Sequence, residues 1–226
     1  MAVILCLETS TTNCSVSIAK NGEVVVAREH NDVNYSHSEN LHKFIKEALK
    51  DASFLLSDIN AIAVSMGPGS YTGLRIGVSA AKGLCYALDV PLISISTLQA
   101  LACQVKTDSG YIIPILDARR MEVYSAVFDR HHQEFRRIKA EIIDDNSFQE
   151  FISKDKTYLI GPGAEKCKTV LNHPNIIFLD DILMPSSKEM AYLAEEKYRT
   201  GDFEDVAYFE PYYLKDFIAG KKKEKA

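Results

Sequence analysis

The sequence predicts an α/β protein of two lobes, each built on a mixed sheet. Two observations support this prediction: a run of three strands opens each half, and helices and strands alternate after it. Hydrophobic residues make up 46% of the 226 positions, which is enough to bury a large core and excludes a disordered chain. The lobe boundary is expected near residues 104–110, with an N-terminal lobe at 1–104 and a C-terminal lobe at 105–226.

Charge and cysteine usage exclude several classes of protein. With 26 basic and 31 acidic residues the net charge is −5, so the chain is poorly suited to bind nucleic acid unaided. The short basic end at 221–225 is typical of a solvated terminus. The five cysteines form no CxxC pair, which argues against a zinc site or a disulfide framework. No apolar run approaches the roughly 18–20 residues of a membrane span and the N-terminus lacks a signal peptide's basic segment, so we expect a reduced, cytoplasmic protein.

The first three predicted strands form a meander. Residues 2–7 are almost wholly apolar, as in a strand buried on both faces. Residues 14–19 alternate apolar and polar side chains, which is the period of a strand. Asn21-Gly22 is a two-residue hairpin turn, so the chain is expected to return through a third strand at 23–28.

Helices and strands alternate after this meander. Apolar residues recur at helical spacing over 36–51, and Ser36 and Glu39 at its start have the spacing of a capping box. Residues 61–65 are a short apolar strand that leads into a glycine-rich loop. The other elements of this half are expected at 74–88 (helix), 91–95 (strand) and 97–105 (helix).

The second half repeats the order. Strands at 112–116, 122–129 and 133–143 are expected to form a second meander. Ser147 and Glu150 repeat the capping-box spacing over a short helix. The remaining elements are expected at 158–160 (strand), 164–171 (helix), 176–179 (strand) and 187–200 (helix).

The polar segment after the first strand is a candidate phosphate loop. Glu8 is followed by four hydroxyl residues, and Thr9 and Ser10 with the backbone amides could face phosphate oxygens while the carboxylate reaches a metal through water. The alternative is an ordinary β-turn whose hydroxyls satisfy the local backbone. No lysine follows within reach, which weakens the phosphate interpretation.

The glycine-rich loop is a second candidate. Gly67 and Gly69 lie between a strand and a helix, where unpaired amides and the helix dipole favour an anion. The segment has neither the GK[ST] of a Walker A loop nor the acidic partner of a dinucleotide-binding motif. Close helix–sheet packing explains the glycines equally well. In the second half, Asp117 lies at the matching position and could hold a metal, whereas the adjacent Arg119 and Arg120 are expected to form surface ion pairs.

A row of small residues marks one face of the helix that follows the glycine-rich loop. Gly73, Gly77, Ala81 and Cys85 recur every four residues, so another helix could approach closely. That helix could come from this chain or from a partner. The two histidines of the preceding helix, His37 and His42, are five apart and point about 140° away from each other, so they predict no metal site.

No local motif identifies a nucleophile or a zinc site, so no catalytic residue and no metal ligand is predicted. Several segments nevertheless resemble the TsaB (YeaZ) family of bacteria, the most specific being the glycine-rich one. Lys215 departs mildly from the family, which often has arginine there. The segments are LCLETST (5–11), CSVS (14–17), SHSE (36–39), GPGSYTGLRIG (67–77) and PYYLK (211–215).

The resemblance implies a two-lobe actin-like, sugar-kinase-like ATPase fold with ribonuclease-H-like lobes. It also implies a role in making N6-threonylcarbamoyladenosine (t6A) at adenosine 37 of tRNAs that read ANN codons. In that pathway TsaD transfers the threonylcarbamoyl group, TsaE is an ATPase, and this family is a non-catalytic partner. The chain is therefore expected to have no cofactor of its own, with ATP and Mg²⁺ on its partners or at a subunit interface, and to meet tRNA only through the complex.

The resemblance further implies that the chain pairs with TsaD, or with a second copy when alone, through its first two helices. The alternative function is an ATP-dependent small-molecule kinase of the same fold, with the two loops and Asp117 as its site; an older glycoprotease label finds no support in the residues. The residues expected at the partner interface are Leu41, Phe44, Ile45, Gly73, Leu74, Gly77 and Ala81.

Overall fold

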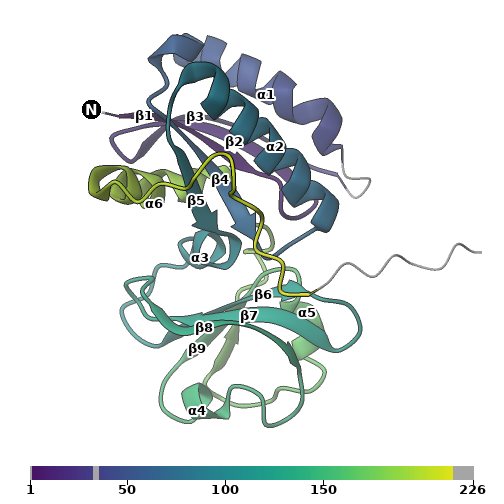
Figure 1. Ribbon diagram of the computed structural model, residues 1–226. Helices are drawn as coiled ribbons and strands as arrows, with labels where there is room; N and C mark the ends of the chain where they lie inside the picture. Colours follow the sequence, from purple (N-terminus) through teal and green to yellow (C-terminus); the bar gives the residue numbers. More distant parts are fainter. Residues whose placement is uncertain (1, 33–35, 216–226) are drawn as a thin grey trace, which may run out of the picture.

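Two five-stranded mixed sheets form the framework of the chain, as predicted (Figure 1). The computed structural model describes residues 2–32 and 36–215. The predicted basic end at 221–225 lies outside the described residues.

The first sheet joins an antiparallel meander to two parallel strands. Its spatial order is β3-β2-β1-β4-β5, with β1 antiparallel to β2 and parallel to β4. Residues Leu5 and Leu7 face one side and Ile4 and Cys6 the other, and both sides are covered, which explains why β1 is apolar throughout. The strands are β1 (Val3–Glu8), β2 (Asn13–Lys20), β3 (Glu23–Asn31), β4 (Ala61–Gly67) and β5 (Leu92–Ser96).

The second sheet repeats the topology of the first. Its order is β10-β9-β6-β7-β8, so β6 takes the central place that β1 holds in the first sheet. The sequence predicted this repeat from the order of the elements alone. The strands are β6 (Tyr111–Asp117), β7 (Glu122–Phe128), β8 (Glu134–Ile142), β9 (Thr157–Ile160) and β10 (Ile176–Phe178).

Helices cover both faces of the first sheet. Helices α1 (His37–Ala52) and α2 (Tyr71–Leu88) pack on one face. Helices α3 (Thr97–Ala102) and α6 (Ser187–Thr200) pack on the other. Helix α3 also contributes Leu98 and Leu101 to the core of the second sheet, so it is shared by the two lobes. The remaining short helices are a 3-10 turn (Leu56–Asp58), α4 (Gln149–Ile152) and α5 (Ala164–Cys167).

The end of the chain returns to the first lobe, which the sequence did not predict. Helix α6 packs against β1 and β2 (Figure 1). Residues 202–215, which we call the strap, then cross the first lobe: Glu204 N donates to Leu92 O at 2.9 Å, and Tyr212 N to Met66 O at 2.7 Å. Residues 187–215 therefore pack on the first lobe and do not belong to the predicted C-terminal lobe at 105–226.

Neither of the two predicted capping boxes forms. Ser36 makes no side-chain cap on α1; instead its hydroxyl accepts from Asn40 Nδ2 at 2.7 Å. Ser147 is not the N-cap of α4 either, because Phe148 takes that place in a left-handed conformation. The helix expected to run to Leu171 ends at Cys167.

The small-residue row of α2 packs against its own chain. A Cβ added to Gly73 would lie 2.1 Å from Thr9 O, and one added to Gly77 would lie 2.3 Å from Thr9 Oγ1. Thr9 Oγ1 in turn donates to Gly73 O at 2.8 Å. The element that packs against the row therefore belongs to this chain and not to a partner. It is the β1–β2 loop, whereas the sequence predicted a helix.

The predicted partner-contact side chains lie inside the monomer. Helices α1 and α2 use their apolar faces to cover the sheet, so these side chains are removed from the surface. A contact made directly by them is incompatible with this packing, and any surface that α2 offers consists of its other residues. The buried residues are Leu41, Phe44, Ile45, Gly73, Leu74, Gly77 and Ala81.

Alanine at a closely packed glycine of α2 and alanine at an exposed glycine of α2 should have opposite effects on stability. We expect Gly73→Ala to lower the free energy of unfolding by about 2 kcal/mol, because the methyl group overlaps Thr9. Gly83, which has open space around it, serves as the matched control, and Gly83→Ala should raise stability by about 0.5–1 kcal/mol. Urea unfolding of the two variants checks both; equal effects would contradict the packing described.

Candidate functional site

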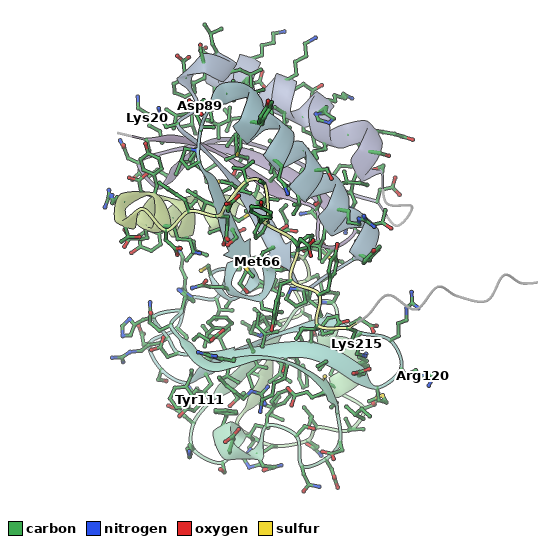
Figure 2. The ribbon with its side chains drawn as sticks, viewed as in Figure 1. Lys20, Met66, Asp89, Tyr111, Arg120 and Lys215 are labelled. Atoms are coloured by element: carbon green, nitrogen blue, oxygen red, sulfur yellow. The ribbon has the colours of Figure 1, made fainter. Side chains whose placement is uncertain are left out.

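A hollow with a volume of about 800 Å³ lies between the lobes. Met66, Arg120 and Lys215, labelled in Figure 2, mark the region where the lobes meet. We call this hollow the interlobe cleft. Its walls come from the β1–β2 loop, the β4–α2 loop, the β6–β7 turn and the strap: Ser10–Thr12, Pro68–Thr72, Leu116–Arg120, Glu122, Tyr124, Pro162, Met184 and Tyr212–Lys215.

The two candidate phosphate loops meet backbone to backbone at the cleft. Ser70 N donates to Ser10 O at 2.6 Å, and a Cβ on Gly69 would lie 2.4 Å from the same oxygen. Gly67 lies beneath the strap, with Tyr212 O 2.9 Å from where its Cβ would be. Gly69 and Ser10 line the cleft, and close packing by itself accounts for the glycines, so a phosphate-binding role for this loop stays a prediction.

Glu8 does not reach the cleft. Its side chain is fully buried, and Oε1 accepts from Ser10 N at 2.6 Å and from Ser65 Oγ at 3.0 Å. Burial raises the pKa of Glu8, and hydrogen bonds from Ser10 and Ser65 oppose the shift. With the Thr9 hydroxyl bonded to α2, the turn interpretation fits Glu8 and Thr9 better than a metal and phosphate loop.

Asp117 does line the cleft, but lysine already neutralises it. Its Oδ1 accepts from Lys166 Nζ at 2.9 Å and from the backbone N of Arg119 at 2.6 Å. The other acidic residue of the turn, Glu122, pairs with Lys215 of the strap. The neighbouring carboxylates with which Arg119 was expected to form an ion pair are therefore already paired with lysines.

The opposite side of the cleft is aromatic. The rings of Tyr71 and Tyr213 lie 5.0 Å apart between centroids. Arg75 lies 5.2 Å from the centre of the Tyr71 ring and donates to its hydroxyl at 2.9 Å. Sequence reasoning missed Tyr213 as a site residue, because nothing local indicates that the strap returns to the cleft.

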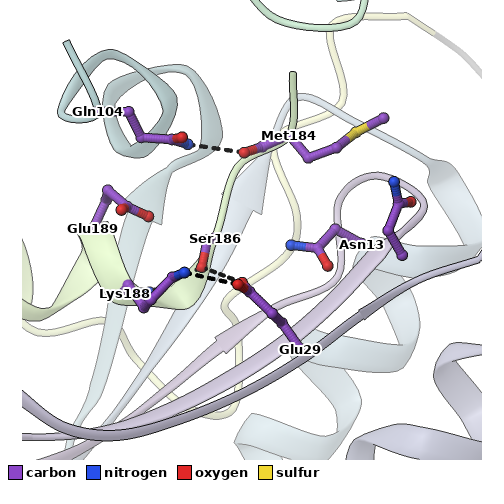
Figure 3. Close-up of a pocket in the computed structure, with 8 residues that line it drawn as sticks. Asn13, Glu29, Gln104, Met184, Ser186, Lys188 and Glu189 are labelled. Atoms are coloured by element: carbon purple, nitrogen blue, oxygen red, sulfur yellow. Dashed lines mark hydrogen bonds and ion pairs between the residues drawn. The ribbon is translucent and has the colours of Figure 1, made fainter. Parts of the chain in front are cut away.

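A second, smaller pocket of about 270 Å³ lies near the start of α6 (Figure 3). Glu29 is held there by Lys188 Nζ and by Ser186 Oγ, each at 2.7 Å. Burial alone would raise the pKa of Glu29, but these hydrogen bonds outweigh it and lower the pKa. Gln104 Nε2 donates to Met184 O at 2.8 Å on the facing wall. The polar groups of this pocket largely satisfy one another.

The histidine pair is separated in space as well as in sequence. His37 is buried and its Nε2 donates to Thr11 O at 2.7 Å, whereas His42 is exposed. Burial lowers the pKa of His37, against the effect of that hydrogen bond. Across the described ranges 2–32 and 36–215, no three His, Cys, Asp or Glu side chains are grouped as metal ligands, and no helix is long and apolar enough to cross a bilayer.

The fold and cleft define a class: a two-lobe α/β protein with a repeated β-meander topology and a cleft between the lobes. The model of the family described as "TsaD: tRNA N6-adenosine threonylcarbamoyltransferase" matches residues 28–222. The solved structure "YeaZ from Pseudomonas aeruginosa" superposes with a TM-score of 0.82 at 25% identity, covering 95% of this chain and 100% of that one.

Two relatives share the name tRNA threonylcarbamoyladenosine biosynthesis protein TsaB. The protein of Escherichia coli (strain K12) is 29% identical over 230 residues, with 97% of each chain covered. That of Buchnera aphidicola subsp. Baizongia pistaciae is 32% identical over 197 residues, covering 83% of this chain and 86% of the relative. The chain belongs to the TsaB (YeaZ) family.

Burial of Glu8 predicts how stability depends on pH. Because the pKa is raised in the folded state, the folded chain holds a proton that the unfolded chain has lost above its ordinary value of 4.5. The free energy of unfolding should therefore fall as pH rises above 4.5, by up to about 1.4 kcal/mol per pH unit, until the raised pKa is passed.

Denaturant unfolding at a series of pH values measures this dependence. We expect Glu8→Gln to flatten it, and Glu23→Gln, which alters an exposed carboxylate of β3, to leave it unchanged. An identical pH profile for Glu8→Gln and the parent would contradict the assignment.

Proposed function

We infer that this chain is a non-catalytic subunit in the biosynthesis of t6A, at adenosine 37 of tRNAs that read ANN codons. In this proposal it pairs with the transferase TsaD and works with the ATPase TsaE in the cytoplasm. ATP, with its Mg²⁺, is bound and hydrolysed by the partners or at an interface with them, and tRNA is modified by the complex. The observation on which the proposal mainly rests is the outward face of α2.

Small side chains form a stripe along that outward face, beside the exposed Tyr86. Ser79, Gly83 and Ala87 are exposed, Ile76 and Ala80 between them are half-buried, and a Cβ on Gly83 would meet nothing within 4 Å. Small residues let the axes of two helices approach to the short end of the usual 8–10 Å range, so this face suits a partner helix. A second copy of the chain could cover the same face when the partner is absent, because identical surfaces form two-fold pairs.

The use made of the acid and histidine side chains supports a non-catalytic role. A kinase of this fold would need a carboxylate directed at Mg²⁺ between the lobes. Glu8 instead bonds Ser10 N and Ser65 inside the first lobe, and Asp117 is paired with Lys166. His37 is likewise engaged with the backbone of the β1–β2 loop. No specific observation favours the small-molecule kinase.

A bulky charge on the outward face should weaken pairing without affecting the fold. We expect Gly83→Arg to weaken binding to TsaD by at least about tenfold, or 1.4 kcal/mol, because the side chain holds the helices apart. Titration calorimetry with the purified TsaD of the same organism measures the affinity, and thermal melting confirms that the variant is folded.

Gly83→Ala is the matched control and should bind within a few-fold of the parent. A substitution on the inner face, such as Gly77→Leu, is unsuitable for this binding test, because the side chain would collide with Thr9 and destabilise the first lobe. Parent-like affinity of Gly83→Arg would show that α2 does not present the partner surface.

A further inference from the structure

The strap connects the two lobes in addition to the helix that they share. Helix α3 joins the lobes through buried side chains, because Ala100 belongs to a core of the first sheet and Leu98 and Leu101 belong to a core of the second. The strap starts on the first lobe, and its last described residue, Lys215, reaches the β6–β7 turn of the second lobe (Figure 2). If the end of the strap came loose, the lobes would still be joined at α3.

Several contacts fix the first part of the strap to the first lobe. The backbone of Glu204 pairs with the edge of β5, and its carboxylate accepts a hydrogen bond from Ser94 Oγ at 2.5 Å. Lys82 Nζ of α2 donates to Ala207 O at 3.1 Å and to Phe209 O at 3.0 Å. The Phe209 side chain also packs against the core beneath α2. This part of the strap is therefore held by both hydrogen bonds and apolar contact.

An ion pair open to solvent holds the end of the strap to the second lobe. Lys215 Nζ pairs with the Glu122 carboxylate and lies 6.0 Å from the centre of the Tyr124 ring. The Lys215 side chain is 38% exposed and the Glu122 side chain 27% exposed. Ion pairs with this much access to water contribute little to stability, and salt screens them. The attachment to the second lobe is therefore the weaker of the strap's two attachments.

We propose that the strap is a releasable clasp, fixed to the first lobe and closed on the second lobe by the ion pair of Lys215 with Glu122. The structure shows the closed form. Residues 212–215 are part of the wall of the interlobe cleft, so release of the clasp lets the lobes separate about α3 and widens the cleft. Because an exposed ion pair shifts an equilibrium only a few-fold, added salt or a change of charge moves the balance between the two forms. The clasp does not depend on the proposed function.

Single-molecule energy transfer on the isolated full chain tests the proposal. A donor and an acceptor dye are attached through azide-bearing residues that replace Lys46 in the first lobe and Lys154 in the second, both of which are exposed. The transfer efficiency reports the distribution of distances between the lobes. We expect Lys215→Glu, which places a like charge beside Glu122, to raise the ratio of open to closed molecules about fivefold. Raised salt should shift the parent chain in the same direction.

A charge swap and a matched control separate the clasp from general effects of charge. Lys215→Glu/Glu122→Lys restores an ion pair with its charges reversed and should return the distribution to that of the parent. Lys43→Glu disrupts an exposed lysine pair within α1, with Glu47, and should leave the distribution unchanged. An unchanged distribution in Lys215→Glu, an equal shift in Lys43→Glu, or a charge swap as open as the single variant would overturn the proposal. Because no partner is present, these outcomes leave the subunit role untouched.

Discussion

The contact between the β1–β2 loop and the inner face of α2 is the constraint on which the rest of the structure depends. Thr9 occupies the space that side chains at Gly73 and Gly77 would fill, and its hydroxyl bonds the helix backbone. This contact brings the start of α2 against Ser10 and so forms one wall of the interlobe cleft. It also decides which face of α2 is left outward.

The same contact explains why polar residues in an apparent phosphate loop have structural roles. In this tightly held loop, the Thr9 hydroxyl is bonded to the backbone of α2, and one carboxylate oxygen of Glu8 accepts from Ser10 N and Ser65 Oγ. Exposed groups that could meet a ligand or partner lie on the β6–β7 turn and on the outward side of α2. A ligand or partner would therefore meet surfaces that the core packing leaves exposed.

Much of the fold could be predicted because it rests on periodicity. The apolar run of β1 and the Asn21-Gly22 turn fix the first meander, and repetition of the element order predicted the second sheet. The strap could not be predicted, because a segment without regular structure carries no periodic signal of what it packs against. Of the predicted loop residues, Ser10 and Gly69 line the interlobe cleft, and a binding role for them stays a prediction. The burial of Glu8 could not be predicted, because Glu8 contacts Ser65 across 57 residues of sequence.

Reconstitution of tRNA threonylcarbamoylation tests the central claim most directly. Purified TsaD and TsaE, a threonylcarbamoyl donor and an unmodified tRNA that reads an ANN codon are combined with and without this chain, and the modified nucleoside is measured. A non-catalytic subunit requires that modification depends on the chain and that the chain alone transfers nothing. Equal modification in its absence, or transfer by the isolated chain, would contradict the account.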